Sequence, residues 1–217
     1  MYDDVAVDAW IQDDPDPVTR AELTELLSAA RSHGEQAQAA RRALSDAFSG
    51  TLAFGTAGLR GRLGGGPNRM NRVVVIRAAA GLSAYLKARL GEGFSVVIGY
   101  DARHNSEQFA RDTAAVVTGA GGRAILFESH CPTPVLAFAL RRLEADAGVM
   151  VTASHNPPQD NGYKVYLGGR AVTDSGQGAQ IVPPYDSQIA AAIDAVGPVG
   201  SVPRPQSGWE TVDPGIR

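Results

Sequence analysis

The sequence predicts an α/β domain of three layers, α/β/α, with a mainly parallel sheet and with further helices ahead of it. Three short apolar runs are typical of buried strands: "FSVVIGY", "RAILFES" and "AGVMVTAS". A helical segment follows the first run, "SEQFARDTAAVVTGAGG", and another follows the second, "PTPVLAFALRRLEAD". Because a β-α-β-α-β order with right-handed crossovers builds a parallel sheet, this alternation predicts the fold class.

Helices are also expected ahead of the sheet. Residues 1–18 carry six aspartates, two prolines and no basic residue, which indicates an acidic lead-in. Helical periodicity begins at Thr19, breaks at Gly34 and then resumes, and Thr19 and Glu22 have the spacing of a capping box. We expect residues 1–50 to form this lead-in and these helices, and to pack on the domain that follows.

The segment 49–71 is dense in glycine and arginine, and this composition is unsuited to a helix or a central strand. The next segment, "RVVVIRAAAGLSAYLKARLG", predicts a helix that ends at Gly91, although Val73–Ile76 alone would also suit a strand. In the helix that follows the first strand, Ser106 is the expected N-cap.

The chain after the third strand predicts a hairpin, a helix and a linker. "GYKVYLGGRAVTD" is expected to form two strands that are joined at the Gly-Gly pair. A helix is expected at about 184–196, and the Pro-, Gly- and Ser-rich end has linker composition. The predicted main domain is therefore 51–196, and residues 197–217 form a linker toward a second domain.

Composition and charge exclude several classes of function. The net charge of −3 gives no general attraction to nucleic acid or to an anionic membrane. The chain has no apolar run of membrane-spanning length, and its acidic start lacks the features of a secretory signal. Cys131 is the only cysteine, so we expect a reducing, cytoplasmic setting in which it is a small buried residue.

Two loops contain groups suited to an anion. "FGTAGLRGRLGGGPNR" combines backbone amides freed by glycine with Arg60 and other arginines, although a flexible surface loop explains it equally well. "GYDARHNS" follows the first strand, at the edge of the sheet where ligands bind in this architecture. Asp101 is expected to be structural there, and Arg103 could belong to the turn or contact an anion.

The loop "TASHNPPQDNGYKVY" presents a serine at the end of the third strand. Neighbouring residues of an extended segment point to opposite sides, so His155 is not expected to serve as the base for Ser154, and a hydrolase is disfavoured. Two prolines and an Asn-Gly pair stiffen the loop, which suits a serine held in one geometry. Lys164 could act on a hydroxyl proton or bind phosphate. The alternative is a rigid connection without chemistry.

These three motifs together resemble the α-D-phosphohexomutases, the superfamily of phosphoglucomutases and phosphomannomutases. "TASHNPPQDNGYKVY" is similar to the active-serine loop of the family, "FGTAGLRG" to its arginine motif and "GYDARHNS" to its third segment. The resemblance runs from about Thr51 to Asp194, and this segment is similar to the first domain of the family only. It looks closest to the phosphoglucomutase-2 and phosphopentomutase-like branch, which includes bacterial phosphomannomutases.

The resemblance implies an isomerase that interconverts hexose or pentose 1-phosphate with the 6- or 5-phosphate through a phosphoserine and a sugar bisphosphate. Ser154 would carry the phosphoryl group, activated by glucose 1,6-bisphosphate, and its phosphate would bind Mg²⁺ with three aspartates of a second domain. The other implied residues fall into two groups. They are Lys164 and His155 as catalytic residues, and Arg60, Arg103, Thr56 and Asn156 as substrate or phosphate ligands.

The chain departs from the family in its length. No D-x-D-x-D-R metal segment is present, so the remaining domains of a full-length enzyme are implied partners, and the chain alone is expected to have negligible mutase activity. Glucose, mannose and ribose or deoxyribose phosphates all fit, because the residues that discriminate sugars belong to later domains of the family. A non-catalytic module that binds phosphosugars, and a structural domain whose loops are only turns, are the two alternatives.

Overall fold

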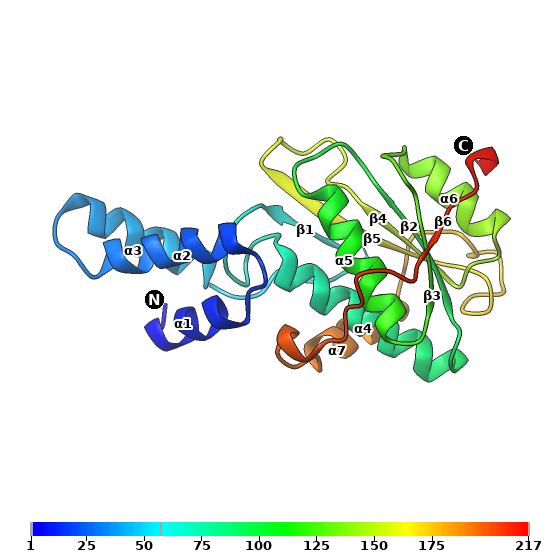
Figure 1. The fold of residues 1–217 in the computed structure, drawn as a ribbon, viewed down its shortest axis with the longest axis horizontal. Coiled ribbons are helices and arrows are strands. Elements are labelled where there is room, and N and C mark those ends of the chain that lie inside the picture. The colour runs from blue at the N-terminus through cyan, green and yellow to red at the C-terminus, as the bar shows by residue number, and fades with distance from the viewer. Residues whose placement is uncertain (1, 57, 217) are drawn as a thin grey trace.

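The computed structural model describes residues 2–56 and 58–216, and it confirms an α/β fold built on one six-stranded sheet (Figure 1). The strand order is β1-β5-β4-β2-β3-β6. The strands have these bounds: β1 Leu59–Arg62, β2 Ser95–Tyr100, β3 Arg123–Leu126, β4 Ala147–Val151, β5 Asp160–Leu167 and β6 Glu210–Thr211. Strands β4, β2, β3 and β6 run parallel, and β5 is antiparallel to both β4 and β1. The sheet is therefore mixed, with a parallel centre.

Helices cover both faces of the sheet, which gives the predicted three layers. Helices α4 (Arg72–Leu90), α5 (Ser106–Gly119) and α7 (Tyr185–Asp194) bury apolar side chains in one core with alternate residues of the strands. Helix α6 (Thr133–Arg142) packs on the opposite face, where Cys131 is buried as predicted. Burial on both faces explains why the central strands read as continuous apolar runs.

The predicted hairpin over 162–174 is only half correct. Its first strand is β5, but the second half does not form a strand. The chain turns at Gly168 and Gly169, and the amides of Ala171 and Val172 bond back to the Gly168 carbonyl. The side chains of Ala171 and Val172 are buried in the core, and both edges of β5 are occupied by β1 and β4, so the segment after Gly169 has no edge of β5 to pair with. Strand β5 instead pairs antiparallel with β4 and β1, and the serine loop is the connection from β4 to β5.

The N-terminal helices have a small core of their own and extend to one side of the α/β body (Figure 1). Their bounds are α1 Asp4–Asp13, α2 Pro17–Ala30 and α3 Glu35–Ala47. The predicted acidic lead-in is thus mostly helical. The N-cap of α2 is Asp16 and not Thr19, because Thr19 is inside the helix and its hydroxyl donates to the Asp14 carboxylate at 2.6 Å.

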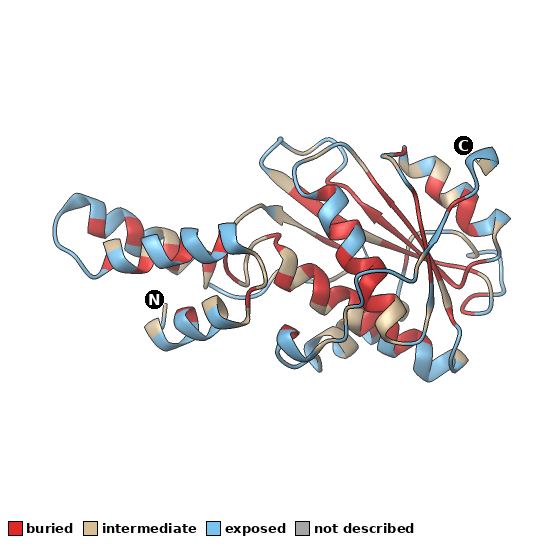
Figure 2. Ribbon diagram, in the orientation of Figure 1, coloured by how far each residue is buried: buried red, intermediate tan, exposed pale blue. Residues whose placement is uncertain are grey.

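Several hydrogen bonds and an ion pair join these helices to the α/β body at the glycine-rich segment. The amide of Gly65 donates to the Glu22 carboxylate at 3.1 Å, so Glu22 binds this segment and does not complete a capping box. Arg69 forms an ion pair with Asp46 of α3. The buried residues of α1, α2 and α3, coloured red in Figure 2, pack together in one cluster. The boundaries at residues 50 and 196 stay predictions.

The C-terminal segment has linker composition, but its described part is not detached. Strand β6 pairs with β3 and extends the sheet by one strand. Val199 is fully buried, and its amide donates to the Asp13 carboxylate of α1 at 2.8 Å. The composition therefore predicted neither strand β6 nor the hydrogen bond that joins the C-terminal segment to α1. Within residues 2–56 and 58–216, no helix has the length and apolar character needed to cross a bilayer.

A buried carboxylate ties together the amino ends of the central strands. Asp146 is 1% exposed and accepts hydrogen bonds from Ser95 and from the backbone and guanidinium of Arg170. Burial disfavours the charged form of Asp146, but hydrogen bonds from Arg170 and Ser95 outweigh it and hold its pKa below the ordinary value.

We expect Asp146→Ala to lower the free energy of unfolding by about 3 kcal/mol, because it leaves buried donors without a partner. Urea unfolding measures this change. The wild-type advantage is fully present above the ordinary aspartate pKa and declines as the pH falls through the lowered folded value. Glu107→Ala, which removes an exposed ion pair with Arg111, is the control and should cost less than about 0.5 kcal/mol. Equal losses in the two variants would contradict the role of burial.

Candidate active site at the carboxyl edge of the sheet

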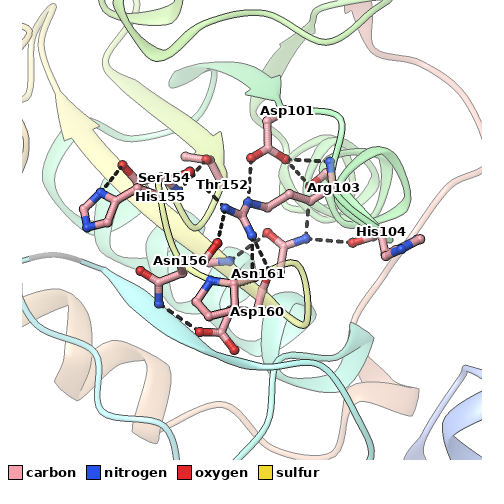
Figure 3. A network of polar contacts seen from close by, with 12 residues as sticks. Asp101, Arg103, His104, Thr152, Ser154, His155, Asn156, Asp160 and Asn161 are labelled. Atoms are coloured by element: carbon pink, nitrogen blue, oxygen red, sulfur yellow. Dashed lines mark hydrogen bonds and ion pairs between the residues drawn. The ribbon is translucent and has the colours of Figure 1, made fainter.

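Two loops meet at the carboxyl edge of the parallel strands. The segment after β2 begins at Asp101, and the β4–β5 connection runs from Thr152 to Gln159. Figure 3 shows that side chains from both loops form one network of polar contacts. The parallel arrangement of β2 and β4 therefore brings together two of the three motifs that the sequence singled out.

Ser154 lies exposed in a turn with a left-handed backbone, φ 59°. This conformation is unusual for a residue with a side chain, and such residues cluster at functional sites. The Ser154 amide donates to the hydroxyl of Thr152 at 2.9 Å, and Thr152 is buried. Thr152 was not assigned a role from the sequence, although a threonine two residues before a turn amide is a known local bonding pattern.

The prediction that Ser154 and His155 point apart is wrong. The Ser154 Oγ and the His155 Nδ1 are 3.4 Å apart, and Figure 3 shows the two side chains adjacent. The prediction assumed an extended segment, whereas the left-handed turn at Ser154 brings the neighbouring side chains to one side. The contacts recorded for His155 in the described chain include no carboxylate that would orient the ring as in a hydrolase triad.

Arg103 spans the space between the two loops. Its two terminal nitrogens donate to four backbone carbonyls of the serine loop, and its Nε lies 3.2 Å from the Asp101 carboxylate. Asp101 is structural as predicted, since it also accepts from the amide of Arg103 and from the Ser106 hydroxyl. Asn105, with φ 64°, is the N-cap of α5 in place of Ser106.

The arginine motif lies next to the serine loop through strand pairing. In the β1–β5 ladder Arg60 is opposite Gly162, and side chains two apart on a strand share a face, so Arg60 and Lys164 lie on the same face of the sheet. Burial lowers the pKa of Lys164 from its ordinary value, and the positive charge of Arg60 lowers it further. A lysine with a lowered pKa gives up its proton more readily than an ordinary lysine, which favours proton transfer.

The segment that contains these motifs is similar to proteins of a known family. A family model described as "Phosphoglucomutase/phosphomannomutase, alpha/beta/alpha domain I" matches residues 51–197, which is more than half of the chain. The chain belongs to this family.

Individual relatives carry mutase names. A Haemophilus influenzae protein named "Probable phosphomannomutase" is 56% identical over 62% of this chain and 27% of its own length. The Saccharomyces cerevisiae phosphoribomutase is 38% identical over 87% of this chain and 28% of its own length. The crystal structure of a candidate phosphomannomutase from Thermus thermophilus has a TM-score of 0.61 and 30% identity, covering 76% of this chain and 33% of that one. The chain thus spans about a third or less of each of these relatives.

Of the other predicted ligands of this phosphomutase domain, Asn156 lies in the serine loop and Thr56 precedes β1. Thr56 is exposed, and its carbonyl accepts a hydrogen bond from Gln180. Asn156 is partly exposed, and its amide nitrogen donates to the Asp160 carboxylate at 2.9 Å. The phosphate-binding roles of Thr56, Asn156 and Arg60 stay predictions, and Asp160, the first residue of β5, had no role predicted from the sequence.

A Mg²⁺ ion would need more oxygen ligands than the described residues bring together at this edge. Among the described residues, no three His, Cys, Asp or Glu side chains lie together as a metal site would need. Asp101, the carboxylate of the loop after β2, is engaged by Arg103 and Ser106. A phosphate on Ser154 could supply one oxygen ligand, and further oxygen ligands would have to come from outside the described residues.

Arg60→Met is expected to raise the pKa of Lys164, because it removes a like charge that opposes protonation. The pKa should remain below the ordinary value, since burial is the larger cause. Titration of the Lys164 ¹³Cε resonance by NMR measures this shift. Arg62→Met, two residues along β1, is the matched control and should leave the pKa unchanged. An equal shift in both variants would assign the effect to net charge and not to Arg60.

Proposed function

We propose that this chain is the phosphoryl-carrying domain of a phosphosugar mutase, in which Ser154 accepts a phosphoryl group and returns it to the sugar. The observation that carries the proposal is Ser154 itself, exposed in a left-handed turn at the carboxyl edge of the sheet. The mutase names of the relatives support a sugar monophosphate as the substrate class. Interconversion of hexose or pentose 1-phosphate with the 6- or 5-phosphate is the reaction that fits these names.

In the loading step, the Ser154 Oγ forms a bond to the phosphorus of a sugar bisphosphate, and the P–O bond to the sugar breaks. The hydroxyl proton passes to a base, for which His155 Nδ1 at 3.4 Å is suitably placed when that nitrogen is unprotonated. The sugar oxygen that leaves takes a proton, and Lys164 is a candidate donor on the same edge of the sheet. Reversal of these events transfers the phosphoryl group to the other sugar hydroxyl.

The phosphoryl group needs cationic partners while its charge shifts. Arg60 is the candidate for this task, because a guanidinium can donate two parallel hydrogen bonds to phosphate oxygens. Mg²⁺, when bound at the phosphoserine, would neutralise further charge on the transferring group. In this proposal the remaining length of a full mutase supplies the other metal ligands and the sugar site, so the 217-residue chain should show negligible turnover in a coupled assay with glucose 1-phosphate.

The test is phosphorylation of this chain by glucose 1,6-bisphosphate, followed by peptide mass spectrometry. The proposal expects one added phosphoryl group on the peptide that contains Ser154. Binding of the bisphosphate without a covalent label would favour a non-catalytic phosphosugar-binding module. If the chain neither binds the bisphosphate nor becomes labelled, the proposal is overturned, and a structural domain whose loops are only turns remains.

A further inference from the structure

Arg103 donates four hydrogen bonds to carbonyls between Ser154 and Asp160. We propose that it is a positioning residue that holds Ser154 in its left-handed turn, and not a ligand of the substrate phosphate. The inference rests on the proposed function for its catalytic meaning, because it assumes that the geometry of Ser154 matters for phosphoryl transfer. The contacts that support it are independent of that function.

All three guanidinium nitrogens of Arg103 have partners inside the protein. One terminal nitrogen donates to the carbonyls of Pro157 at 2.8 Å and Asp160 at 3.1 Å. The other donates to the carbonyls of Ser154 at 2.9 Å and Asn156 at 2.8 Å, and Nε faces the Asp101 carboxylate. An anion could bind Arg103 only by displacing one of these oxygens. The guanidinium is therefore already bonded to the loop carbonyls and to Asp101.

The loop needs such an external support. Pro157 and Pro158 lack backbone N–H groups, and Ser154 occupies a conformation that a residue with a side chain adopts at a cost. The hydrogen bonds within the turn are short-range: the amides of Asn156 and Asp160 donate to the carbonyls of Ala153 and Pro157, and the Asn156 side chain donates to the Asp160 carboxylate. A planar fork with five donors can reach four carbonyls and one carboxylate together, which the three donors of a lysine cannot do.

Arg103 is itself fixed from both sides. Its side chain is 14% exposed, and Asp101 accepts a hydrogen bond from its backbone amide and forms an ion pair with its Nε. Asn161, at the start of β5, donates to the His104 carbonyl and to the Ser106 hydroxyl, which in turn donates to Asp101. Figure 3 shows these contacts around the guanidinium. The position of Ser154 is thereby tied to the ends of β2 and β5.

The test compares Arg103→Lys with Arg111→Lys by hydrogen–deuterium exchange. Arg111 is an exposed arginine on α5 whose guanidinium bonds Glu107, so its variant is a matched control. In Arg103→Lys the hydrogen-bonded amides of Ser154, Asn156 and Asp160 should exchange at least about 10-fold faster, while β4 keeps its protection. Arg111→Lys should leave all of these rates unchanged.

A chemical rescue adds a readout that a loss of overall stability would not give. In Arg103→Ala, guanidinium ion at millimolar, non-denaturing concentration should restore part of the loop protection, whereas NaCl at the same ionic strength should not. Unchanged loop exchange in Arg103→Lys would overturn the inference. Equal loss of protection in the loop and in β4 would also overturn it, because Arg103 would then be a general stabiliser.

Labelling of Ser154 by glucose 1,6-bisphosphate separates this inference from the proposed function. If wild type is labelled, Arg103→Lys should slow labelling by about 10-fold or more without weakening bisphosphate binding. Weaker binding with an unchanged loop would make Arg103 a phosphate ligand and overturn the inference. If wild type is not labelled, the proposed function fails, and the exchange rates still decide whether Arg103 positions the loop.

Discussion

Ser154→Ala is expected to abolish covalent labelling of the chain by glucose 1,6-bisphosphate. The proposed reaction forms a bond between the phosphoryl group and the Ser154 Oγ, and alanine has no oxygen with which to form it. The fold should not change, because the hydrogen bond of residue 154 to Thr152 uses the backbone amide and the recorded contact of the hydroxyl is with His155. Intact-mass and peptide mass spectrometry measure the loss.

The control for this prediction is Ser187→Ala. Ser187 is an exposed serine on α7 whose hydroxyl donates to the Pro184 carbonyl, away from the serine loop. It should be labelled as wild type is labelled, on the Ser154 peptide. A phosphoryl group that persists on Ser154→Ala would show that another side chain is the acceptor, and the assignment of Ser154 would then be wrong.

Gly58→Ala is expected to lower the free energy of unfolding by about 3 kcal/mol. Gly58 has φ 71°, and a Cβ atom built there would lie 1.9 Å from the carbonyl oxygen of Tyr163 in β5. The backbone conformation disfavours any side chain, and backbone atoms of a buried strand cannot move aside cheaply. The substitution should therefore push β1 away from β5 and carry Arg60 away from Lys164.

Urea unfolding measures the stability of this variant, and Gly55→Ala is its matched control. Gly55 pairs with Gly58 in a short bridge, and a Cβ there would meet nothing within 4 Å. It should change the free energy of unfolding by less than about 0.5 kcal/mol. Similar losses from both substitutions would show that the whole glycine-rich segment is intolerant, and that the contact with β5 is not the cause.

Much of the fold was predictable because it depends on local patterns. The apolar runs that became β2, β3 and β4 alternate with helical segments, and buried parallel strands are among the clearest sequence signals. The pairing of β5 was not predictable in this way, since an antiparallel strand can pair with the strand before it or with one after it. Pairing with β4 on one side and with β1 on the other occupies both edges of β5 and leaves no edge for the predicted second strand.

The same distinction between local sequence patterns and long-range contacts applies to the candidate site. The sequence by itself determined Ser154 as the candidate reactive residue, the stiff loop around it and the family, because these are encoded in one contiguous motif. Only the tertiary structure decided what His155 and Arg103 contact. The His155 contact depends on one left-handed backbone angle, and Arg103 meets carbonyls more than fifty positions further along the chain. Hydrogen bonds between segments so far apart exist only after β2 and β4 have paired and brought their carboxyl ends together.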